Sequence, residues 1–248
     1  MKVLRLGVSH DVREDIPLED RQHVVAERML QEATGLEWET VTKSMWPTEE
    51  LPGLIDRWVE REQPDMVVLY LAGYWTSFGS TALQLERRVP LAGKPLASVV
   101  RKLAENKTAS QYESLDRLRG LASAIIGVDF NFDPDELVQL FEGIFRRLLR
   151  NEHLVIAVRG PGRPPQRLTK RQERKSVDRA NRFQRGIEDV CTRLHIEHLR
   201  YEEPPLHTRI PGDPAHYTAE GSRMVGEQQG ELMVRAWRSA QGEAPVTG

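Results

Sequence analysis

The chain contains three residues whose types and order are suited to acting together in catalysis: Ser9, Asp213 and His216. Ser9 directly follows an apolar segment at residues 3–7, and Asp213 and His216 stand three apart just before the last helix-like segment. A neutral imidazole can take the proton of a serine hydroxyl, while a carboxylate holds the ring in the right tautomer. This order indicates nucleophilic attack by a serine, provided that the fold brings the two ends of the chain together.

The elements between these residues alternate between strands and helices. Strands are predicted at 3–7, 36–41, 66–72, 154–158 and 197–201, and helices at 18–34, 47–62, 98–121, 133–150, a charged segment ending near 194, and 219–238. Such alternation predicts an α/β fold, with helices on both faces of the sheet. We therefore expect a three-layer α/β/α flavodoxin-like sandwich with a five-stranded parallel sheet.

The same layout predicts where the reactive residues meet. In parallel sheets, ligands bind beyond the carboxyl ends of the strands, near the point where strand order reverses. Ser9, the loop at Gly73, the turn at Gly160 and the loop that carries Asp213 and His216 each follow a predicted strand. We expect all of them at one rim, with the Ser9 hydroxyl within hydrogen-bond reach of a His216 ring nitrogen.

Both ends of the chain resemble sequence blocks of the SGNH (GDSL-type) hydrolase superfamily. The segment Leu6-Gly-Val-Ser-His10 is similar to the block in which Gly-Asp-Ser ends the first strand, with Val8 in place of the acid. Asp213-x-x-His216 followed by Tyr-Thr-Ala-Glu-Gly resembles the family's closing block. The resemblance implies cleavage of an acyl, acetyl or carbohydrate ester without a cofactor, with Ser9 as nucleophile, His216 as base and Asp213 as the acid that orients it.

Two further blocks of the family are not matched. The block Gly-x-Asn-Asp falls on residues 73–76, where Trp75 stands in the Asn position, and residues 40–47 contain no glycine. These residues normally supply oxyanion-hole donors, and loss of one donor costs roughly 2.7–4 kcal/mol of transition-state stabilisation. The resemblance therefore implies an atypical oxyanion hole.

We expect His10, Gly73 and Trp75 to line the substrate site. The Trp75 ring is predicted to be partly exposed there, either as a wall of the pocket or as an oxyanion donor through Nε1–H. Ser44, a backbone amide near Gly73 and His10 are the other replacement donors. His207 is a rival base in the same loop as His216, but it lacks an acid three residues upstream.

Other reactive or charged groups have simpler interpretations. Cys191 lies at helical apolar spacing and is expected to be a buried small hydrophobe. The basic segment 163–185 could bind an anion, although a solvated helix face is the favoured interpretation. No His, Cys or acidic cluster has metal-ligand spacing, so no metal site is expected.

Composition limits the remaining classes of protein. The chain has 248 residues, 39% of them hydrophobic and 29% charged, with a formal net charge of −2. We expect a single domain over 1–240 with a disordered tail at 241–248. The net charge argues against a nucleic-acid partner, and the family resemblance implies a small-molecule or carbohydrate ester as the substrate. No membrane span or secretory leader is recognisable, which favours a cytoplasmic protein. A homo-oligomer is compatible with the sequence.

Two other functions stay open. The fold of this superfamily could have kept its pocket for binding or scaffolding after losing efficient catalysis, which the missing oxyanion donors favour. A flavodoxin-like nucleotide or flavin binder could use the loop 7–11 for phosphate. That loop has no second glycine and contains Asp11, which repels phosphate.

Overall fold

A parallel sheet forms the centre of the molecule, as the sequence predicts. The computed structural model describes residues 1–7, 15–78, 128–162, 168–210 and 213–243. Its central strands are β1 (Lys2–Gly7), β2 (Glu39–Ser44), β3 (Met66–Tyr70), β4 (Val155–Arg159) and β5 (Glu197–Leu199). They pair in parallel in the order β2-β1-β3-β4-β5. The predicted five-stranded parallel sheet is therefore confirmed.

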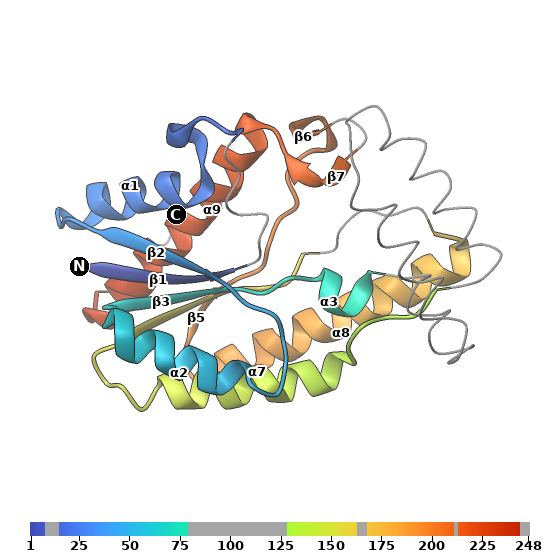
Figure 1. The fold of residues 1–248 in the computed structure, drawn as a ribbon, viewed down its shortest axis with the longest axis horizontal. Helices are drawn as coiled ribbons and strands as arrows, with labels where there is room; N and C mark the ends of the chain where they lie inside the picture. Colours follow the sequence, from blue (N-terminus) through green and yellow to red (C-terminus); the bar gives the residue numbers. More distant parts are fainter. Residues whose placement is uncertain (8–14, 79–127, 163–167, 211–212, 244–248) are drawn as a thin grey trace.

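Helices cover both faces of this sheet (Figure 1). One face carries α1 (Gln22–Thr34) and α9 (Ala219–Ala240), and the other carries α2 (Leu51–Glu62), α7 (Pro134–Leu148) and α8 (Lys170–Arg193). The shorter elements are the 3-10 helices η2 (Leu18–Asp20) and η4 (Leu206–Thr208), the helix α3 (Tyr74–Ser77), and the strands β6 (Arg209–Ile210) and β7 (Asp213–Tyr217). The predicted three-layer α/β/α arrangement is confirmed.

Successive side chains of a strand point to opposite faces of the sheet, so an apolar core forms on each face. In β1, Val3 packs on the α1 and α9 side, whereas Leu4 and Leu6 pack on the α2, α7 and α8 side. Every residue of β3 is buried, as expected for a central strand covered on both faces.

Local signals fix several helix ends where the sequence predicts them. The Asp133 carboxylate accepts a hydrogen bond from the Asp135 backbone N–H at 2.9 Å, and Pro134 occupies the first turn of α7. Gly35 ends α1 in the left-handed region, with a φ of 68°. Each of these signals acts on its immediate neighbours, so it can be recognised without knowledge of the tertiary structure.

Cys191 is fully buried in α8, and its predicted structural role is confirmed. Burial raises the pKa of this thiol to about 12. At neutral pH the side chain is therefore a protonated thiol and not a nucleophile.

The prediction that Asp213 and His216 lie in a loop is wrong. These residues belong to β7, which pairs antiparallel with β6 and places Tyr217 opposite Arg209. A two-stranded hairpin leaves each strand at an edge, where the missing N–H of Pro214 is tolerated. Pro214 is thus compatible with a strand at this position. The helix predicted at 98–121 lies in a part of the chain that the structure does not describe.

Candidate active site at the carboxyl rim of the sheet

Strand order reverses at β1, and Gly7 closes this strand at the carboxyl end of the sheet. Ser9 and His10 follow Gly7 by two and three residues, and both belong to segment 8–14, outside the described residues. The predicted hydrogen bond between Ser9 and His216 therefore stays a prediction. The same holds for a role of His10 at the substrate site and for the pairing of Asp213 with His216.

The strand that carries His216 is attached to the same end of the sheet. The hydroxyl of Tyr217, the next residue in β7, is hydrogen-bonded to the hydroxyl of Tyr201, just beyond β5. Arg209 in β6 forms an ion pair with Glu203, and its Nη2 lies 3.4 Å from the Tyr217 hydroxyl. These contacts hold the β6–β7 hairpin against the carboxyl end of β5, near the start of α9 (Figure 1).

Burial strengthens the preference of the two phenols of this hydrogen bond for the neutral form. Loss of solvent raises the pKa of Tyr201 and the pKa of Tyr217 above the ordinary value for tyrosine. One hydroxyl can then donate to the other without placing a charge in the interior. Sequence reasoning missed both tyrosines, although Tyr217 is adjacent to His216 and Tyr201 ends a predicted strand.

The start of α9 fixes the far end of β7. Thr218 caps the helix, its side chain accepting from the Gly221 N–H at 3.4 Å, and its backbone N–H donates to the Thr208 carbonyl at 2.8 Å. A Cβ on Gly221 would lie 2.4 Å from that carbonyl oxygen. Glycine is therefore required at position 221 for the close approach of α9 to η4.

Gly221→Ala is expected to lower the free energy of unfolding by about 1–3 kcal/mol, because the new Cβ must displace backbone. This loss should outweigh the helix propensity of alanine, which favours the substitution by up to about 1 kcal/mol. The matched control is Gly143→Ala in α7, where a Cβ would meet no atom within 4 Å. Urea unfolding should place the control at or above wild-type stability. A Gly221→Ala protein as stable as the control would contradict the packing argument.

The structure corrects the prediction for Trp75. Its side chain is 0% exposed and stacks on Phe141 of α7, with ring centroids 5.6 Å apart and an interplanar angle of 12°. Its Nε1–H is also buried and donates to no group in the described part of the chain. The expected partial exposure is wrong, and in this structure a substrate can reach neither the ring nor the Nε1–H.

The cause is the conformation of the segment after β3. The backbone N–H groups of Thr76 and Ser77 donate to the Gly73 carbonyl at 3.2 and 3.0 Å, and the Ser77 hydroxyl donates to it at 2.7 Å. The predicted loop is thereby closed into α3, which turns Trp75 toward α7. Gly73 lies at the carboxyl end of β3, as predicted, but it is buried.

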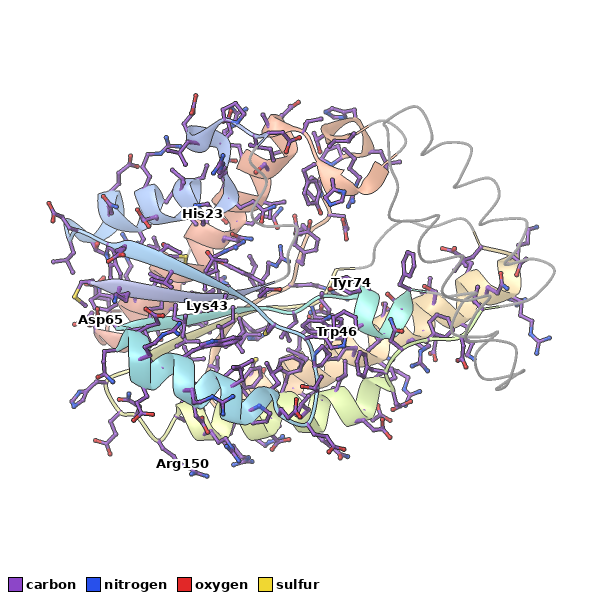
Figure 2. The ribbon with its side chains drawn as sticks, viewed as in Figure 1. His23, Lys43, Trp46, Asp65, Tyr74 and Arg150 are labelled. Carbon is purple, nitrogen blue, oxygen red and sulfur yellow. The ribbon has the colours of Figure 1, made fainter. Side chains whose placement is uncertain are left out.

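Two other aromatic residues lie at this rim instead. The Trp46 side chain, just after β2, is 45% exposed, and its ring centroid lies 5.8 Å from that of Tyr74 in α3. Figure 2 shows the two side chains close together beside α3, although they come from different segments. Sequence reasoning missed both; the strand predicted at 36–41 is β2 at 39–44 in the structure, and only this shift places Trp46 directly after a strand that ends at the rim.

The remaining candidates face solvent or have structural roles. His207 is exposed in η4. In the basic segment, Arg179 donates to the Thr76 carbonyl at 2.8 Å, and Arg182 forms an ion pair with Asp135. Part of this positive charge therefore fastens α8 to its neighbours.

The described residues contain no group of three or more His, Cys, Asp or Glu side chains that could hold a metal ion. Among the helices of these residues, none has both the length and the apolarity needed to cross a membrane.

Comparison with known proteins reveals similarity in fold and not in sequence. No protein-family model matches the chain, and no curated protein matches it. Among solved structures it is similar to the psychrotrophic esterase EstA from Pseudoalteromonas sp., with 9% identity, 96% of this chain and 98% of that chain covered, and a TM-score of 0.56.

Two further solved structures are similar to this chain in fold. TesA has 13% identity, with 92% of this chain and 95% of that chain covered and a TM-score of 0.54. The family 3 carbohydrate esterase of Clostridium thermocellum has 14% identity, with 96% of this chain and 98% of that chain covered and a TM-score of 0.52. The predicted resemblance is confirmed at the level of the fold: the chain has the fold of the SGNH (GDSL-type) hydrolases.

Proposed function

We propose that the protein is a serine-dependent hydrolase of carboxylic esters, with Ser9 as nucleophile, His216 as general base and Asp213 as the acid that orients His216. The observation that carries this proposal is the attachment of β7 to the carboxyl end of β5 through Tyr217 and Tyr201. It holds the strand of His216 at the end of the sheet where β1 also ends. The similarity to esterases in fold supports the same reaction class.

The chemistry follows from these roles. Ser9 Oγ attacks the acyl carbon while His216 takes the hydroxyl proton, and His216 then gives that proton to the departing alcohol. Water, activated by the same imidazole, releases the acyl group from Ser9. The reaction uses the triad, its oxyanion donors, water and a small-molecule or carbohydrate ester.

The oxyanion hole is the unusual part of this site. The Trp75 Nε1–H is buried, so it is no longer a candidate donor to the oxyanion. Among the remaining donors, Ser44 is exposed at the end of β2 and is paired in register with Gly7 at the end of β1. We therefore favour Ser44, together with the Ser9 backbone N–H, as the source of the oxyanion hydrogen bonds.

A fluorophosphonate probe tests the nucleophile directly. Wild-type protein is expected to be labelled on the peptide that contains Ser9, because phosphonylation of a serine mimics the tetrahedral intermediate. Ser9→Ala should remove the label, and Ser44→Ala should slow labelling without moving it to another peptide. Labelling that persists in Ser9→Ala would refute the proposed nucleophile.

A binding or scaffold protein with this fold is the second candidate. The observation in its favour is Trp75, which fills the core at the position where the family's oxyanion asparagine is expected. This candidate function predicts that the probe does not label Ser9 in the folded protein.

A further inference from the structure

Arg159 is the last residue of β4, at the carboxyl end of the sheet. The rest of the strand is Val-Ile-Ala-Val, and Arg159 is paired in register with Tyr70, the last residue of β3. Its carbonyl accepts from the Leu71 N–H at 3.1 Å, and the next N–H, of Gly160, donates to the Leu199 carbonyl at 2.8 Å. Neighbouring strands on both sides therefore fix the backbone that carries this guanidinium.

Two aromatic rings contact the guanidinium group. Its central carbon lies 5.1 Å from the centroid of the Tyr70 ring and 4.3 Å from that of the Tyr201 ring. Both distances are within the range of cation–π attraction. Tyr201 is the residue whose hydroxyl bonds Tyr217, next to His216. Arg159 thus packs on the same ring that anchors the strand of the proposed base.

The guanidinium is half-buried and has no acidic partner among the described residues. It makes no ion pair and donates no hydrogen bond there, and its Nε is buried without an acceptor. By contrast, Arg209 is paired with Glu203, and Arg182 is paired with Asp135. A partly desolvated cation without an acceptor among these residues is costly, and an anionic group of a ligand would supply one.

We propose that Arg159 binds a carboxylate or phosphate group of the ligand, so that the proposed hydrolase acts on an anionic ester. That the anionic ligand is an ester rests on the proposed function. That Arg159 binds an anion does not depend on it. A guanidinium presents its donors in a planar fork that matches two oxygens of such a group. Contact with Tyr70 and Tyr201 restricts the orientation of that fork before the ligand arrives.

The kinetic test uses matched esters. 4-Acetoxybenzoate and 4-acetoxyphenyl phosphate carry an anion, and methyl 4-acetoxybenzoate is a neutral ester with the same acetyl group. The ratio of kcat/KM for an anionic ester to that for the neutral ester should fall about tenfold in Arg159→Gln. The anionic ester that is more affected identifies whether a carboxylate or a phosphate is preferred.

The matched control is Arg200→Gln, which removes the same charge just beyond β5. The Arg200 side chain is 67% exposed and its Nε lies 3.8 Å from a Glu188 carboxylate oxygen. The ratio should stay at its wild-type value in this variant. A second variant, Arg159→Lys, keeps the charge but loses the fork, and an intermediate ratio is expected; it also serves if Arg159→Gln fails to fold.

Direct binding separates this inference from the hydrolase proposal. Calorimetric titration of the full chain with benzoate and with phenyl phosphate should show binding of at least one of them, weakened about tenfold by Arg159→Gln and unchanged by Arg200→Gln. If this pattern holds but no Ser9-dependent hydrolysis is found, the anion site stands and the hydrolase proposal falls. If neither anion binds, or if Arg159→Gln binds as tightly as wild type, the anion site is overturned whatever the hydrolysis result.

Discussion

Ser9→Ala and His216→Ala are each expected to lower kcat/KM for a small acetylated chromogenic phenol by about a thousandfold or more. The wild-type rate itself should be weak, because two donors that the family uses for the oxyanion are absent. Nucleophile and base act as one unit, so the double variant should be hardly worse than either single variant. Asp213→Asn should also be severe, because an amide favours the wrong tautomer of His216.

His207→Ala is the matched control for the base, since His207 is an exposed histidine in the neighbouring η4. This variant should hydrolyse the ester at the wild-type rate. If His207→Ala abolishes turnover and His216→Ala does not, the base has been assigned to the wrong residue. An unchanged rate in Ser9→Ala would mean that the hydrolysis is adventitious, and the binding or scaffold function would then be preferred.

Trp75→Ala is expected to lower the free energy of unfolding by about 3–5 kcal/mol, the range typical of a large aromatic deleted from a core. The ring is fully buried and stacked on Phe141, so its removal leaves a cavity between α3 and α7. Urea unfolding measures the change. Trp75→Phe should cost clearly less, about 1–2 kcal/mol, because it keeps an aromatic ring and removes a buried N–H that has no acceptor in the described part of the chain.

Trp46→Ala provides the comparison for the same residue type at the rim. Trp46 is 45% exposed, so its truncation should cost about 1 kcal/mol or less. Equal losses in Trp46→Ala and Trp75→Ala would contradict the assignment of Trp75 to the core. They would instead return Trp75 to the substrate site that the family resemblance suggests.

The sheet and its helices could be predicted because their signals are local or periodic. The apolar segments that form β1 and β3 predict strands that are covered by helices on both faces of the sheet, and both strands are buried in the structure. Asp133 and Gly35 mark helix ends through bonds to their immediate neighbours. Once the alternation of strands and helices is known, the rim at which ligands bind follows from topology alone.

Side-chain direction within the connecting segments could not be predicted in this way. Trp75 turns inward because the Gly73 carbonyl collects hydrogen bonds that close α3, and because Phe141 from a distant helix offers a ring to stack on. Aligning the family block with residues 73–76 assigns each residue a position in the block, but it does not predict which way the Trp75 ring points.

The same limit applies to the strand of His216 and to Arg159. β7 is held at the rim by the contact of Tyr217 with Tyr201, and Arg159 is placed by the rings of Tyr70 and Tyr201. These partners are separated by many residues and belong to different strands or, for Tyr201, to the segment just beyond one. Their contacts exist only after the sheet has set its strand order, so no local pattern encodes them, and tertiary packing decides which side chains lie together at the rim.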